Sequence, residues 1–172
     1  MSGHSKWSQI KHKKAVSDQQ KGRMFSKLSR AITVAARGNP DQKSNARLRT
    51  AVETARRANM PSENIDRAVA KVSDATSSQL QELRLEILAP GNIALLVAMI
   101  TDNRNRTMSE LRNIASSHKS RLMEPGSLVW MFRQAPPPAF SESDVAHVRV
   151  LVDALNGHED VQGVRINIVL PS

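Results

Sequence analysis

The sequence contains no cysteine among its 172 residues. This absence excludes a disulfide-stapled scaffold, a thiolate zinc site, an iron–sulfur cluster and a cysteine nucleophile. The longest apolar run, from Ile93 to Ile100, is far shorter than the roughly 20 residues that a helix needs to cross a bilayer, so no membrane partner is expected. The length favours one domain or two small ones and excludes a large catalytic barrel. We therefore expect an intracellular protein.

Motifs for nucleotide and metal chemistry are also missing. The seven glycines never fall at the spacing of a Walker A loop or of a dinucleotide-binding fingerprint. The five histidines form no HExxH motif and no close pair, so we predict neither a metal nor another cofactor. Capping and solvation suffice to explain carboxylates such as Glu110, Asp153 and Asp160. Because no acid–base pair or nucleophile is recognisable, the protein is not expected to be an enzyme.

Acidic residues are scarce in the first half of the chain. The residues up to Ala75 include 16 Lys or Arg and 6 Asp or Glu, a charge of +10, whereas the rest include 9 and 10, a charge of −1. Such a concentration of positive charge is typical of a module that binds a polyanion, because each cation near a phosphate releases a condensed counterion. It favours a nucleic acid as the partner over a merely soluble, highly charged helical domain.

The first half carries the periodicity of three helices. The first helix is predicted between the capping-box spacing at residues 17–20 and the stop at residues 38–40, after a basic arm formed by the preceding residues. The second is predicted from Ser44 or Asn45 to Ala58, and the third begins near Pro61. Together they form a small helical bundle.

The first predicted helix has two contrasting faces. Its apolar face consists of Phe25, Leu28, Ile32 and Ala36, and its cationic face of Arg23, Lys27, Arg30 and Arg37. In the arm, four lysines surround Trp7 and His12. Trp7 either stacks on an unpaired base while the ammonium groups hold phosphates, or anchors the arm onto the helices. The predicted nucleic-acid-binding residues are Lys6, Trp7, Lys11, His12, Lys13, Lys14, Lys21, Arg23, Lys27, Arg30 and Arg37.

The second half alternates strands and helices. Strands are predicted around residues 83–87, 93–100 and 164–168 and from Ser127 to Arg133. One helix is predicted to open at the capping box of Thr107 and to end near Ser117, and another runs from the capping residues 141–144 to Gly157.

This order predicts an α+β protein: an N-terminal all-α helical domain, residues 1–78, followed by a four-stranded α/β sandwich of the ferredoxin-like type, residues 79–172. Two helices cover one face of the sheet, and the pattern leaves the strand order open. The stretch 135–139, which contains three consecutive prolines, is interpreted as a stiff extended connector within the sandwich domain.

A polar junction, residues 101–107, links a buried strand to a helix N-terminus. Free backbone N–H groups there, beside Arg104 and Arg106, could hold an anion such as a phosphate. Alternatively, Asp102 and the two asparagines tie the turn together through side-chain hydrogen bonds.

Several ordered motifs resemble the YebC/PmpR family. They are Gly-His-Ser-Lys-Trp at residues 3–7, Ile-Lys-His-Lys-Lys-Ala at 10–15, Ala-Ala-Arg at 35–37, Ala-Asn-Met-Pro at 58–61 and the junction at 101–107. The resemblance implies a helical N-terminal domain followed by α/β domains, and a transcriptional regulator that binds DNA. Some relatives instead associate with the ribosome and aid synthesis through proline-rich stretches, which would make ribosomal RNA the partner.

The chain resembles a short form of that family. Longer members carry an additional α/β domain between the third strand and the last helix, where this chain has only the proline-rich connector. Since the match to the opening motif starts at Ser2, we expect no cleaved presequence and a bacterial cytoplasmic protein. DNA binding is the first hypothesis, although only Gln19 and Gln20 suggest base recognition, and a basic arm with a single tryptophan slightly favours structured RNA. The oligomeric state stays open.

Overall fold

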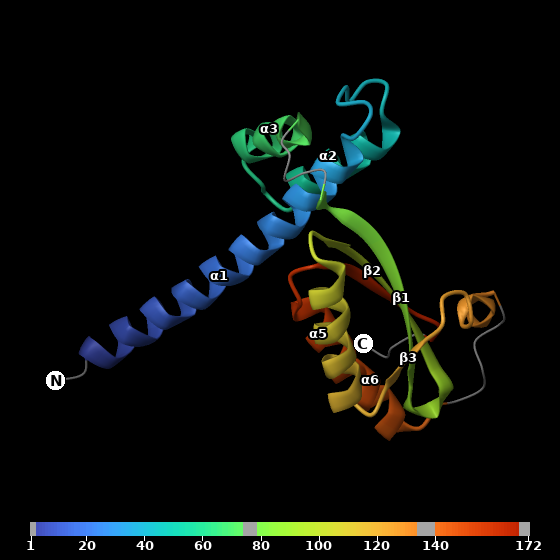
Figure 1. The fold of residues 1–172 in the computed structure, drawn as a ribbon. Coiled ribbons are helices and arrows are strands. Elements are labelled where there is room, and N and C mark those ends of the chain that lie inside the picture. Colours follow the sequence, from blue (N-terminus) through green and yellow to red (C-terminus); the bar gives the residue numbers. More distant parts are fainter. Residues whose placement is uncertain (1–2, 74–78, 134–139, 169–172) are drawn as a thin grey trace. The chain divides into compact units, whose positions relative to one another are not determined.

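Figure 1 shows the computed structural model, which describes residues 3–73, 79–133 and 140–168. The chain divides into two compact units, Met1–Ser77 and Ser78–Ser172. The first is helical, and the second contains a four-stranded sheet. In the described ranges, no helix is both long enough and apolar enough to cross a membrane.

The helical unit consists of α1 (Gly3–Ala35), α2 (Ala46–Arg57), α3 (Ser62–Ala70) and the short 3-10 helix η1 (Lys71–Ser73). Both α2 and α3 pack against the C-terminal part of α1. The buried core of this unit contains Ile32, Ala35, Ala36, Leu48, Val52, Ala55, Met60, Ile65 and Ala68. Because four of these residues are alanines, the helices approach closely, and the Thr33 hydroxyl reaches the Ala68 carbonyl at 2.8 Å.

The first helix is longer than predicted. It begins at Gly3, so the predicted start at Ser17 is wrong, and the capping-box residues lie inside the helix. Residues 4–16 contain no proline or glycine and several good helix formers, so nothing in them interrupts the helix. The basic arm is therefore a continuation of α1.

Asn45 joins the end of α1 to the start of α2. Its side-chain oxygen accepts a hydrogen bond from the Leu48 N–H at 3.0 Å, and its amide donates to the carbonyls of Ala35 and Asn39. The predicted helix start at Asn45 is thereby confirmed, with Asn45 as the N-cap. In the same turn, hydrogen bonds from the Lys43 backbone N–H and the Ser44 hydroxyl lower the pKa of Asp41.

The second unit has the predicted chain order of strand, strand, helix, strand, helix, strand. Its regular elements are β1 (Gln81–Ala89), β2 (Ile93–Thr101), α5 (Arg104–Ser117), β3 (Arg121–Met123), α6 (Glu142–Gly157) and β4 (Val161–Ile166). Two 3-10 helices, η2 (Pro90–Asn92) and η3 (Val129–Phe132), complete it. The sheet is antiparallel with the order β3-β1-β2-β4, so the β1–β2 hairpin lies in its centre.

Both long helices of this unit cover one face of the sheet, as predicted (Figure 1). The β1–β2 register places Leu85 opposite Val97 and Ile87 opposite Leu95, so their side chains share that face. Buried residues of α5 and α6 pack onto them. The helix residues in this core are Leu111, Ala115, Val148, Leu151 and Leu155.

Two predicted element positions are wrong. The third strand is β3, and the segment predicted as a strand from Ser127 to Arg133 contains η3 instead. Gly126 turns the chain with φ +89°, and the Glu86 carboxylate then accepts the N–H groups of Gly126 and Leu128, both at 2.6 Å. Because these two N–H groups donate to Glu86, they are not used for backbone pairing with a neighbouring strand.

The other misplaced position is the start of α5. It begins at Arg104 rather than at the capping box of Thr107, because the side chain of Asn103 caps the helix by accepting from the Arg106 N–H. The predicted helix that starts after Ser141 and reaches Gly157 is confirmed. The proline-rich connector at 135–139 lies outside the described residues.

Candidate nucleic-acid interface

All but one of the predicted nucleic-acid-binding residues lie on α1. Its 33 residues form a rod about 50 Å long at 1.5 Å per residue. The structure describes the backbone but not the side chains of its first part, which carries Lys6, Trp7, Lys11, His12, Lys13 and Lys14. Among the side chains of α1 that the structure describes, the core contacts begin at Phe25, and residues 17–24 are exposed. The backbone of the N-terminal part of α1 extends away from α2 and α3 (Figure 1).

The described cations of α1 differ in exposure. Lys21 and Arg23 are exposed, and Lys27 and Arg30 are half-buried. Arg37 is exposed in the turn that follows the helix. The Lys21 ammonium lies 5.6 Å from the centre of the Phe25 ring, within the range of a cation–π contact. The helical wheel predicted that Arg23, Lys27, Arg30 and Arg37 face solvent; Arg23 and Arg37 are exposed, whereas Lys27 and Arg30 are half-buried.

Lys27 has a perturbed environment. Burial lowers the pKa of this lysine, and the positive charge of Arg23 lowers it further. Both causes disfavour the charged form, because burial removes water from the ammonium and a like charge repels it. A polyanion bound beside these two residues would offset that cost.

We predict that Arg23→Gln raises the pKa of Lys27 without fully restoring its ordinary value, because burial is the larger of the two causes. The pKa can be followed through the ε-methylene signals of Lys27 in an NMR titration. Arg56→Gln, which removes a cation from α2, is the control and should leave this pKa unchanged. An equal pKa in the Arg23 variant and in the wild-type protein would contradict the prediction.

Exposed arginines on α2 extend the positive surface of the helical unit. The outward positions of α2 are occupied by Arg47, Arg49, Arg56 and Arg57. The helical periodicity had placed them outward, but they were not included among the predicted binding residues. Arg56 and Arg57 also lie in the last turn, where they favourably face the helix dipole.

Arg104 and Arg106, the two arginines predicted to form an anion site at the polar junction, have different surroundings. Arg106 donates to Asp102 at 2.9 Å and to Asp160 at 3.0 Å, and the hydrogen bond with Asp160 is the main cause that raises the pKa of Arg106. Arg104 instead lines a separate cavity in the same unit. Arg106 thus holds the fold together, as in the alternative interpretation of this junction.

Asp160 is the buried centre of this network. Its side chain is fully buried and also accepts a hydrogen bond from the Thr107 hydroxyl at 2.6 Å, and the hydroxyls of Thr107 and Thr101 are 2.7 Å apart. The expectation that solvation explains Asp160 is therefore wrong. Its backbone carbonyl accepts the Ile100 N–H at 2.9 Å, which brings the residue beside the end of β2.

Two neighbours of Asp160 complete a group with metal-ligand chemistry. Glu110 and His158 are joined by a 2.8 Å contact between Oε2 and Nε2, and ligand atoms of all three residues lie within 4.8 Å of one another. The Arg106 guanidinium contacts Asp160 and approaches Glu110 to 4.0 Å. This cation supplies the positive charge that the carboxylates need, so the group is an ion-pair network.

The fold and the charge distribution define an α+β protein in which a cationic helical unit precedes a nearly neutral α/β sandwich. The profile of the TACO1/YebC protein N-terminal domain matches residues 5–75, and that of the TACO1/YebC second and third domain matches residues 80–137. The chain belongs to the TACO1/YebC family, and the resemblance found in its motifs is confirmed.

Curated relatives carry the name probable transcriptional regulatory protein. One from Desulfitobacterium hafniense is 50% identical over 136 residues, covering 78% of this chain and 54% of the relative. One from Aquifex aeolicus is 44% identical over 173 residues, covering 98% of this chain and 70% of the relative. The chain thus spans between about half and 70% of the length of these relatives.

The fold also matches a solved structure. The crystal structure of a conserved hypothetical protein from Aquifex aeolicus superposes with a TM-score of 0.76 and 28% sequence identity. The superposition covers 90% of this chain and 93% of that chain. The predicted α+β class is therefore confirmed.

Proposed function

We propose that this protein is a nucleic-acid-binding regulator of gene expression that binds DNA through its helical unit. The observation that carries the proposal is the charge of +10 up to Ala75, combined with a long basic helix whose N-terminal part extends away from α2 and α3. The name of the relatives, probable transcriptional regulatory protein, supports DNA as the target. Regulation rather than catalysis is the proposed role, and the bacterial cytoplasm is the proposed place of action.

The shape of α1 suits a DNA groove. The major groove of B-DNA is about 12 Å wide and admits an α-helix. Lysines and arginines along the helix would neutralise phosphates and release counterions, which supplies affinity without sequence selectivity. Gln19 and Gln20 are exposed on the same helix, and glutamine can pair with the edge of adenine. They are the residues that we propose for base contacts.

Co-sedimentation of the full chain with ribosomes, across a salt series and with excess duplex DNA as competitor, tests the proposal. We expect the duplex to strip the protein from ribosomes. In a parallel titration, the DNA affinity should fall with salt at a logarithmic slope of about −0.9 per phosphate contact. Retention on ribosomes despite the duplex would assign the protein to translation instead, with ribosomal RNA as its partner. Binding to neither would overturn the proposal.

A further inference from the structure

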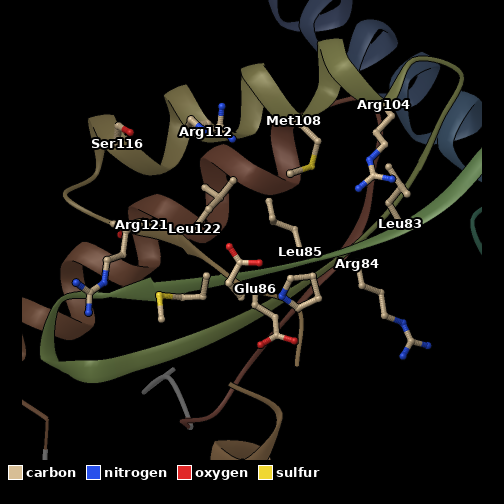
Figure 2. A pocket seen from close by; sticks show the side chains of 14 residues that line it. Leu83, Arg84, Leu85, Glu86, Arg104, Met108, Arg112, Ser116, Arg121 and Leu122 are labelled. Carbon is tan, nitrogen blue, oxygen red and sulfur yellow. The ribbon is translucent and has the colours of Figure 1, made fainter. Parts of the chain in front are cut away.

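The second unit contains a cavity of about 570 Å³ between α5, β1 and the segment 120–125. Figure 2 shows Arg104 and Met108 reaching from α5 toward Leu83 and Leu85 on β1, with Arg112 farther along the same helix. Apolar side chains and arginines both line it. The apolar lining residues are Leu83, Leu85, Met108, Leu122, Met123 and Pro125, and the arginines are Arg84, Arg104, Arg112 and Arg121.

One wall of this cavity is the part of the β1 edge that β3 does not cover. β1 pairs with β2 along its whole length, but β3 pairs only with residues 86–88 of β1. No strand in the described part of the chain pairs with residues 81–85 on that side. β3 does not continue along β1, because Pro125 lacks a backbone N–H and the chain turns at Gly126. The backbone N–H and C=O groups of an open edge are a template for an added strand.

The arginines beside this edge lack internal partners. Among the described residues, neither Arg104 nor Arg112 forms an ion pair, whereas Arg106, between them in sequence, forms three. The nearest lining carboxylate on β1, Glu86, is engaged by two backbone N–H groups. The described lining therefore holds four arginines against two carboxylates, Glu86 and Glu124, which leaves it with an excess of positive charge.

The spacing along α5 matches the repeat of an extended chain. Arg104, Met108 and Arg112 follow one another at intervals of four residues, about 6 Å along the helix axis. Alternate residues on one face of a strand are about 6.6 Å apart. We propose that this groove binds an extended acidic peptide segment, which adds to the β1 edge as a strand. An acidic residue faces Arg104, an apolar residue two positions away faces Met108, and a second acidic residue, four from the first, faces Arg112.

A protein segment fits this groove better than a nucleic acid does. Single-stranded nucleic acids are held by aromatic side chains on which bases stack, and none of the described lining residues is aromatic. The apolar lining and the strand edge are the features that a peptide uses.

The test uses the full chain and a fluorescein-labelled octapeptide with glutamate at its third and seventh positions, valine at the fifth and threonine elsewhere. We expect saturable binding by fluorescence anisotropy. Arg104→Glu with Arg112→Glu should weaken it at least tenfold, whereas Arg133→Glu, an exposed control outside the groove, should leave it unchanged. Because both groove arginines are exposed, circular dichroism should show a native fold.

Two further probes separate strand addition from simple charge attraction. An octapeptide with lysine in place of both glutamates should not bind. N-methylation of the alternate peptide nitrogens that face β1 should abolish binding, whereas N-methylation of the nitrogens on the opposite edge should not. The proposal would be overturned if the wild-type protein did not bind the peptide, or if the double variant bound it with equal affinity. It would also be overturned if N-methylation had no effect on either edge of the peptide. If the double variant no longer bound a labelled single-stranded RNA but still bound the peptide, the groove would be assigned to nucleic acid instead. Duplex DNA binding of the double variant should equal that of the wild type, which separates this proposal from the proposed function.

Discussion

Replacing Lys11, Lys13 and Lys14 together with glutamate is expected to lower the affinity for duplex DNA by about two to three orders of magnitude at roughly 0.1 M salt. Each phosphate contact contributes a factor of about eight to the binding constant at that salt concentration, since the logarithmic slope is about −0.9 per contact. Three contacts therefore account for roughly 500-fold, and the introduced carboxylates add repulsion. The slope itself should become shallower by about 2.7.

A matched triple variant distinguishes this effect from a general change in charge. Lys119, Arg133 and Arg149 lie in the second unit and are exposed. Changing all three to glutamate alters the net charge by the same amount, but is expected to change the DNA affinity only slightly. Both variants should keep the wild-type circular dichroism, because glutamate is as compatible with a helix as lysine and the three residues of the second unit are exposed. Equal losses in the two triples would show that net charge, not the helix, governs binding.

The sequence predicted the elements better than their ends. Helical periodicity located α2 and α6, and local capping residues fixed their starts at Asn45 and Ser141. The same logic failed at Ser17, because capping-box spacing also occurs inside a helix when nothing interrupts the residues before it. At Thr107 it failed because Asn103 caps the helix four residues earlier, and Thr107 is instead buried beside Asp160.

Long-range hydrogen bonds explain the misplaced third strand. The apolar residues between Ser127 and Arg133 resemble a strand, but Glu86 on β1 accepts two N–H groups at the start of that segment. Glu86 lies 40 residues earlier in the chain, so no local pattern could indicate this contact. Strand order escaped prediction for the same reason, since pairing of β4 with β2 depends on contacts between distant segments.

The candidate interface was predictable only as a charge distribution. Lysines and arginines are visible in any sequence, and their concentration before Ala75 marked the helical unit. The groove beside β1 was not visible, because it depends on where β3 ends relative to β1. Arg104 and Arg106 are alike in sequence, yet the fold commits Arg106 to Asp160 and leaves Arg104 in the groove.

Asp160→Ala is expected to destabilise the second unit by about 3 kcal/mol, because it removes a buried carboxylate that accepts from both Arg106 and Thr107. For a unit of this size, that loss corresponds to a fall in Tm of roughly 12 °C or more in calorimetry. Asp160→Asn should cost less, because both hydrogen bonds go to Oδ2 and an amide oxygen in that place can still accept them, although it no longer carries the charge that pairs with Arg106.

Asp102→Asn is the matched control for this prediction. Asp102 contacts the same Arg106 guanidinium at 2.9 Å, but its side chain is 46% exposed, so water replaces much of the lost interaction. Its expected cost is below about 1 kcal/mol. A double-mutant cycle between Asp160→Ala and Arg106→Met should show strong coupling, because each residue alone would leave the other without its main partner. Equal costs for Asp160→Ala and Asp102→Asn would contradict the central role of the Asp160 carboxylate. They would mean that the backbone hydrogen bond from the Ile100 N–H to the Asp160 carbonyl is enough to hold the end of β2 beside Asp160.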